Sequence, residues 1–177
     1  MTRALPAPFA IRGARLDELP GLQRIEREAG ALFVAFGVTG EGDVLSIAAM
    51  VEAHAAALLW VVADGNDAPV AFAACWAHPD ALHLREIDVD PRHMRRGFGR
   101  ALVDHARRVA SARGLSQVTL TTFLHVPWNA PLYRRYGFAV LDDATLPAWL
   151  AAIRLAETPT VGDAALPRVA MSIASLP

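Results

Sequence analysis

The sequence predicts a mixed α/β domain in which one sheet carries helices on both faces. Three short apolar segments separated by turn signals follow one another before residue 90, which is typical of a meander of strands. After them, strand-like segments alternate with helical ones. Strands that meander and then alternate with helices indicate a mixed sheet. The 177 residues suit a single domain over residues 1–177.

The N-terminal part is expected to hold one strand, two helices and then the meander. Asp17 is a candidate cap for the first helix, and residues 31–36 form a second helical piece. Ser46 or Asp43 would cap the next helix. The expected ranges are 9–12 for the first strand, 18–29 and 47–57 for the helices, and 58–63, 70–76 and 82–89 for the meander.

The C-terminal part begins with an amphipathic helix over residues 97–113. Phe98, Leu102 and Ala106 recur at helical spacing, and Gly114 is the expected stop. The other expected elements are strands at 118–123, 138–141 and 168–173, helices at 130–136 and 146–157, and a loop at 158–167.

Composition excludes several classes of protein. The single cysteine, Cys75, permits no intramolecular disulfide and favours a reducing, cytoplasmic compartment. We expect no signal peptide and no membrane span, because no apolar run approaches about 20 residues. The net charge of −1 argues against a nucleic-acid partner. All 17 basic residues are arginine, so the chain offers no lysine side chain for acylation.

An anion site is predicted where the strand at 82–89 runs into the helix at 97–113. The turn between them carries Arg92, Arg95 and Arg96 together with Gly97 and Gly99. Glycines let the backbone approach a bulky anion, and the free N–H groups of a first helical turn point toward it. Arginines add charge and forked donors that suit phosphate.

Other chemistries are disfavoured. A dinucleotide-binding run would need glycine at position 102, where Leu102 stands, and the P-loop lysine is missing. We expect no metal site, because Cys75 has no partner cysteine and the histidines are scattered. The histidines are His54, His78, His83, His93, His105 and His125.

The arginine–glycine turn resembles the fingerprint of the GCN5-related N-acetyltransferases, the GNAT family. That fingerprint is Gln or Arg, two residues, Gly, one residue, then Gly or Ala. Here Gly97 and Gly99 match, and Met94 stands where the family usually has Gln or Arg. The flanking residues 89–91 and 100–102 are also similar to the family.

A second stretch, residues 129–138, is similar to the family's later motif, in which a helix carries a tyrosine and ends at Gly-Phe. Tyr133, Gly137 and Phe138 match. The resemblance implies a GNAT-like fold, with a twisted, mixed but mostly antiparallel sheet of about six or seven strands. It also implies acetyl-CoA as co-substrate and a primary amine as acceptor, without a metal.

The resemblance assigns roles to residues. The pantetheine arm would lie along Ile87, Asp88 and Val89, whose backbone would also polarise the thioester carbonyl. The pyrophosphate would lie on the helix N-terminus. The coenzyme-binding residues implied beyond the strand are Met94, Arg95, Arg96, Gly97, Phe98, Gly99, Arg100 and Asn129.

Tyr133 is the expected acid, because a tyrosine with a pKa of about 10 is protonated at pH 7 and can donate to the leaving thiolate. Glu86 is the preferred candidate base, with Asp88, His125 or a chain of waters as alternatives. Glu26 either attracts a cationic amine or, as we expect by default, is an exposed helix charge. Tyr136 is expected in the core.

The acceptor side is less determined by the sequence. Phe33, Phe36 and Trp128 either line the acceptor cleft or, as the spacing favours, belong to the core. The acceptor would depend on loops at 37–44, 125–128 and 142–145. The acceptor is a small-molecule or peptide amine, and a homodimer is compatible with the resemblance. Two alternatives stay open: a catalytically weak acyl-CoA-binding sensor with the same fold, and a nucleotide-binding enzyme using the same turn.

Overall fold

The computed structural model describes residues 5–36, 44–158, 160–161 and 164–176 of the chain. Within these residues, one sheet has seven strands in the order β1-β2-β3-β4-β5-β9-β6, and a second sheet is the pair β7-β8. The strands are β1 (Ala10–Gly13), β2 (Leu59–Ala63), β3 (Pro69–Ala77), β4 (Ala81–Val89), β5 (Gln117–Phe123), β6 (Ala139–Val140), β7 (Thr160–Val161), β8 (Ala164–Ala165) and β9 (Arg168–Ala174).

Five α-helices and four 3₁₀ turns complete the described residues. The α-helices are α1 (Leu19–Gly30), α2 (Ile47–Ala55), α3 (Phe98–Ala112), α4 (Ala130–Tyr136) and α5 (Ala148–Ala156). The 3₁₀ turns are η1 (Leu16–Glu18), η2 (Ala31–Phe36), η3 (Pro91–His93) and η4 (Asp143–Thr145). No helix in the described ranges is both long and apolar enough to cross a membrane.

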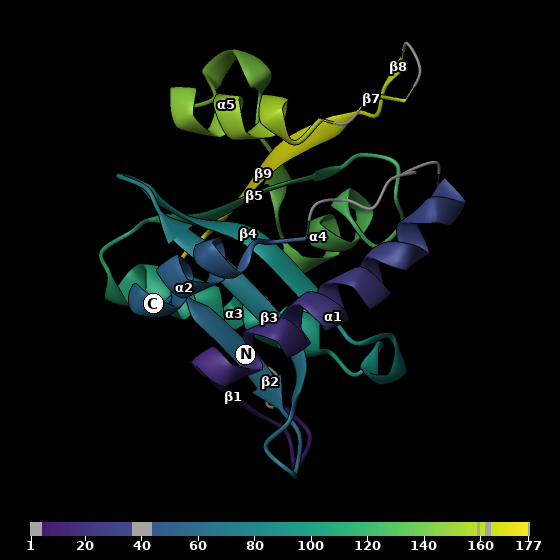
Figure 1. Cartoon of the computed structure of the whole chain (residues 1–177). Coiled ribbons are helices and arrows are strands. Elements are labelled where there is room, and N and C mark those ends of the chain that lie inside the picture. Colours follow the sequence, from purple (N-terminus) through teal and green to yellow (C-terminus); the bar gives the residue numbers. More distant parts are fainter. Residues whose placement is uncertain (1–4, 37–43, 159, 162–163, 177) are drawn as a thin grey trace.

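The predicted fold class is confirmed. Among the strand pairs of the described residues, only β4 and β5 run parallel. This is the pair joined through α3, and a parallel pair requires such a crossover. Figure 1 shows α1 and α2 over one face of the sheet and α3 on the other, with α5 above β9.

Each face of the sheet buries its own apolar cluster. Phe98 and Leu102 of α3 pack with Leu82 and Leu84 of β4. On the opposite face, the buried residues of α1 and α2 pack against Phe72 of β3. The hydrophobic spacing in the sequence therefore predicts correctly which sides of α1 and α3 are buried.

A β-bulge in β4 changes which side chains face α1. Leu84 pairs with Cys75 and Glu86 pairs with Ala74, so Arg85 is an extra residue in β4. Because side chains alternate along a strand, the extra residue shifts the alternation by one. As a result, Leu82 and Leu84 face α3, whereas Glu86 and Asp88, which follow the bulge, face α1.

The sheet opens between β4 and β5. The two strands pair only where residues 81–83 meet residues 117–119. Beyond that point β5 stays with β9 along its whole length, while the rest of β4 pairs with β3 alone. We call the resulting gap, beside residues 84–89, the β4–β5 opening.

Two local expectations differ from the structure, and a third is not tested by it. Asp17 lies in η1, and α1 begins at Leu19 with Glu18 before it. The Glu18 carboxylate instead accepts the backbone N–H of Arg15 and pairs with Arg12. The predicted loop at 158–167 contains β7 and β8 in its described part. The predicted loop at 37–44 lies outside the described residues except for residue 44.

Candidate active site

The turn after β4 is fixed by a buried aspartate. Asp90 is 2% exposed, and its Oδ1 accepts the backbone N–H of Arg92 at 2.9 Å. The guanidinium of Arg92 also donates to Asp90 Oδ2 at 2.6 Å. This bonding lowers the pKa of Asp90 to about 2, so the carboxylate stays charged and holds the turn near neutral pH.

The turn leaves a row of backbone donors unused. Within the described residues, no hydrogen bond uses the backbone N–H of residues 94–100, and the first helical bond runs from Ala101 N to Gly97 O at 3.0 Å. Arg95 and Gly97 have left-handed φ angles of 63° and 87°. A Cβ on Gly97 would meet nothing within 4 Å, so the space beside this backbone is open. These features fit a phosphate group.

The arginines of the turn divide into two groups. Arg92 is paired with Asp90, and Arg100 is paired with Asp104 at 3.1 Å and also donates to the carbonyl of Tyr136. Arg95 and Arg96 are exposed and form no ion pair with a described residue. Of the arginines predicted to attract phosphate, Arg95 and Arg96 therefore have no anionic partner among the described residues, although the guanidinium of Arg96 lies 5.7 Å from the centre of the Phe9 ring. Met94 and Gly99 are half-buried and Phe98 is buried in the core.

Tyr133 lies on α4 near the β4–β5 opening. Its ring packs edge-on against Tyr136 and Phe138, with centroids 6.1 Å and 5.5 Å away. Burial, together with the negative charges of Glu86 and Asp88, raises the pKa of the Tyr133 hydroxyl above its ordinary value. The phenol is therefore a proton donor throughout the neutral range. Tyr136 packs against the core beneath the guanidinium of Arg100, as expected.

Three carboxylates come together on the α1 face of β4. One oxygen of each of Glu26, Glu86 and Asp88 lies within 4.8 Å of one oxygen of the others. We call these residues the carboxylate cluster. Glu26 is 9% exposed, so its expected position as an exposed helix charge is wrong. Its Oε1 accepts the backbone N–H of Leu45 at 2.8 Å.

The three carboxylates of the cluster repel one another, and all three have raised pKa values. Burial, followed by the charge of Glu86, raises the pKa of Glu26 to about 7. Burial also raises the pKa of Glu86, and burial with the charges of Glu86 and Glu26 raises the pKa of Asp88 well above its usual range. Two adjacent carboxylates in such a site favour sharing a proton.

The three predicted aromatic residues lie together, two of them just after α1, the helix that carries Glu26. Trp128 meets Phe33 and Phe36 edge-on, with ring centroids 5.7 Å and 4.7 Å away. All three are half-buried and lie outside the two apolar clusters of the sheet, which differs from the expected core position. His125, an alternative base, lies 3.2 Å from the carbonyl of Phe36 and is not part of the carboxylate cluster.

Two further predicted residues have simple positions. Asn129 precedes α4, and its side chain makes no capping hydrogen bond there. Its carbonyl accepts the backbone N–H of Tyr133 at 2.9 Å, so Asn129 helps to set the start of the helix. Cys75 is a fully buried free thiol.

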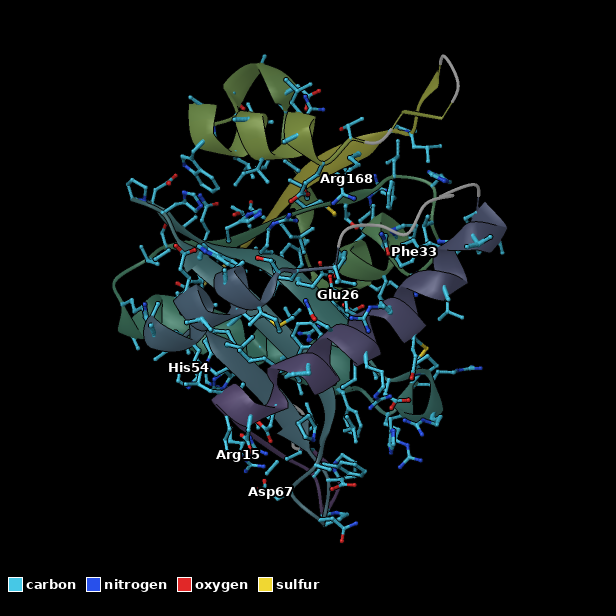
Figure 2. All side chains as sticks on the ribbon, viewed as in Figure 1. Arg15, Glu26, Phe33, His54, Asp67 and Arg168 are labelled. Atoms are coloured by element: carbon cyan, nitrogen blue, oxygen red, sulfur yellow. The ribbon has the colours of Figure 1, made fainter. Side chains whose placement is uncertain are left out.

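An ion-pair network that the sequence did not predict lies next to the β4–β5 opening. Arg168 of β9 donates to Glu157 at 2.8 Å, and Arg85 and the Thr121 hydroxyl also bond that carboxylate. Arg168 also lies over the ring of Phe123, and Figure 2 labels it where β9 passes β5. The one sequence signal for this network was a charged residue starting an otherwise apolar strand.

Sequence comparison gives a family match. The model of the Acetyltransferase (GNAT) family matches residues 23–138. The chain is 32% identical over 141 residues to streptothricin acetyltransferase of Streptomyces lavendulae, which covers 77% of this chain and 67% of that protein. It is 38% identical over 84 residues to mycothiol acetyltransferase of Beutenbergia cavernae, covering 46% of this chain and 28% of that protein.

Structure comparison agrees with the sequence match. The PaiA N-acetyltransferase of Thermoplasma acidophilum, solved with coenzyme A, superposes with a TM-score of 0.69. The alignment covers 93% of this chain and 97% of that one at 16% identity, so it concerns the fold.

Proposed function

The chain belongs to the acetyltransferase (GNAT) family, and on this basis we propose that it transfers the acetyl group of acetyl-CoA directly to a primary amine. The observation that carries the proposal is the arrangement of groups around β4. Its end leads into the unused N–H groups of residues 94–100. Its opened edge lies near Tyr133 and bears Glu86 and Asp88.

The coenzyme would be held by backbone more than by side chains. The N–H groups of the turn at 94–100 would bind the pyrophosphate, with Arg95 and Arg96 adding charge. At Ile87, Asp88 and Val89 one edge of β4 has no strand partner, because β5 does not pair with this part of β4. This edge offers hydrogen-bonding groups to the pantetheine arm. Asn129, at the start of α4, is a further proposed contact.

Transfer requires two proton movements. The amine attacks as the neutral base, so Glu86 accepts its proton while the new N–C bond forms. The C–S bond then breaks, and Tyr133 donates its proton to the leaving sulfur. Asp88 beside Glu86 is the alternative acceptor of the amine proton, because the two carboxyls lie within 4.8 Å and are coupled. The position of these groups beside one opening supports both proposed roles.

The acceptor class is proposed to be a small-molecule or peptide amine. The half-buried aromatic group of Phe33, Phe36 and Trp128 supports this, because it offers an apolar wall just beyond the helix that carries Glu26. A catalytically weak acyl-CoA-binding sensor is the second candidate. Met94 at the first position of the glycine turn favours it, since that position lacks the polar side chain usual in the family.

The Tyr133→Phe variant tests the proposed mechanism. It keeps the ring against Tyr136 and Phe138 and removes the proton. General acid catalysis contributes about 10²–10⁴-fold, so kcat should fall by roughly that factor. The KM for acetyl-CoA should change little, because the phosphate contacts remain. Thiol release under steady-state conditions measures both constants.

A built-in control uses a second thioester whose thiol has a lower pKa. That leaving group needs less help from an acid, so the effect of Tyr133→Phe should shrink with it. Full turnover by Tyr133→Phe with acetyl-CoA would show that another donor protonates the thiolate.

A further inference from the structure

The carboxylate cluster of Glu26, Glu86 and Asp88 has no ion-pair partner among the described residues. Arg85, which directly precedes Glu86 in the chain, is paired with Glu157. The Oε2 atom of Glu26 and the Oδ2 atom of Asp88 are buried and have no hydrogen-bond partner in the described part of the chain.

The side chain of Glu26 is held in place by one hydrogen bond and has one oxygen left for a ligand. Its Oε1 is held by the N–H of Leu45, which fixes the carboxylate and leaves Oε2 unbonded. Figure 2 shows Glu26 extending from α1 toward the middle of the sheet, where β4 runs. A buried acceptor without a partner is costly in a folded protein, and a bound cation would remove that cost.

The reacting amine alone does not supply this cation. It must be neutral when it attacks, and Glu86 takes its proton only as the reaction proceeds. An acceptor with one amine therefore leaves Glu26 and Asp88 without a positive partner at the moment of attack. A second ammonium on the same molecule would supply three donors to the unbonded carboxylate oxygens.

We propose that the carboxylate cluster is a subsite for a second ammonium group, so that the acceptor is a diamine or polyamine with a short spacer between its amines. This inference rests on the proposed function. One amine faces Glu86 and Tyr133 and is acetylated. The other stays charged and is held by Glu26 and Asp88. The spacer is short because the three carboxylates lie within 4.8 Å of one another.

The test compares 1,3-diaminopropane with propylamine and 3-amino-1-propanol, which have the same spacer and only one amine. Thiol release gives kcat/KM for each amine with wild type, Glu26→Gln and Glu28→Gln. Glu28 is the matched control, because it lies on the same helix and pairs with Arg24 away from the cluster. Gln at position 26 keeps an oxygen for the N–H of Leu45 and removes the charge.

The wild type and Glu28→Gln should prefer the diamine over both monoamines by about tenfold or more, since a hydrogen bond to a buried charge contributes at least that factor. Glu26→Gln should reduce this preference to about one- or twofold, mainly through KM. Calorimetric titration of 1,3-diaminopropane into the enzyme with coenzyme A should show the same loss of affinity.

Different failures are distinguishable. Equal kcat/KM for diamine and monoamine in the wild type, or an unchanged preference in Glu26→Gln, overturns the subsite. Diamine binding that needs Glu26 but gives no turnover supports the subsite and contradicts the proposed transfer reaction. Three carboxylates also suit a hard divalent cation. One-to-one binding of Mn²⁺ that depends on Glu26 and resists competition by the diamine would overturn the proposal.

Discussion

At the residue scale, the position of Glu26 differs most from what its sequence context suggests. A glutamate on an amphipathic helix normally faces water, yet this one is buried beside two further carboxylates. The two other carboxylates are there because of the bulge at Arg85, which turns Glu86 and Asp88 to the face that α1 covers. Helical spacing alone places Glu26 next to the buried Leu22 and Ile25 but does not reveal the acids beneath it.

The raised pKa of Glu26 predicts a pH-dependent stability effect. Its pKa is about 4.5 in the unfolded chain and about 7 in the folded one, so the folded state binds more protons between these values. Folding stability from this group is therefore fully present below pH 4.5 and is lost as the pH rises through 7. Above pH 7 the folded protein holds an unfavourable charge beside Glu86.

Glu26→Gln should therefore raise the melting temperature at pH 8 and leave it nearly unchanged at pH 4.5. Allowing for screening by solvent, we expect about 1–2 kcal/mol, or roughly 3–6 °C. Thermal unfolding at the two pH values measures it, with Glu28→Gln as the control. A lower melting temperature at pH 8 would mean that the cluster stabilises the fold.

At the element scale, several helix ends and turns lie where the sequence predicts them. The 3₁₀ turn η2 and the helix α4 have the bounds that the sequence indicates. Gly114 and Gly137 end their helices with left-handed φ angles of 73° and 100°. Ser46 caps α2 by accepting the N–H of Ala49 at 3.2 Å. These features are local, so neighbouring residues decide them.

The glycine turn before α3 gives a prediction at this scale. Gly97→Glu should abolish coenzyme A binding, because its carboxylate would occupy the open space beside the N–H groups and repel phosphate. The φ of 87° makes any side chain there strained by about 1–2 kcal/mol, so the fold should survive. Calorimetric titration with coenzyme A measures the loss.

Gly114→Glu is the matched control for Gly97→Glu. It lies just past the other end of α3 with a φ of 73°, so it carries a similar backbone strain. Its affinity for coenzyme A should equal that of the wild type. Unchanged affinity of Gly97→Glu for coenzyme A would instead contradict the placement of the phosphate at this turn.

At the scale of the whole molecule, the sheet's opening is what the sequence could not reveal. The strands β4 and β5 are each recognisable from composition, but the point where they stop pairing is set by the tertiary fold. The ion pair of Arg168 with Glu157 likewise joins parts of the chain that only the tertiary fold brings together. Motif residues such as Tyr133 and Gly97 could be named from sequence because the family pattern marks them.

The central claim is that this opening is an acetyl-transfer site. The most direct measurement incubates the protein with acetyl-CoA and a panel of mono- and diamines, and quantifies free thiol and acetylated amine together. We predict one acetylated amine per thiol released, with calorimetry showing coenzyme binding. Tight coenzyme binding without transfer to any amine would contradict the account in favour of a sensor, and absence of coenzyme binding would contradict the site itself.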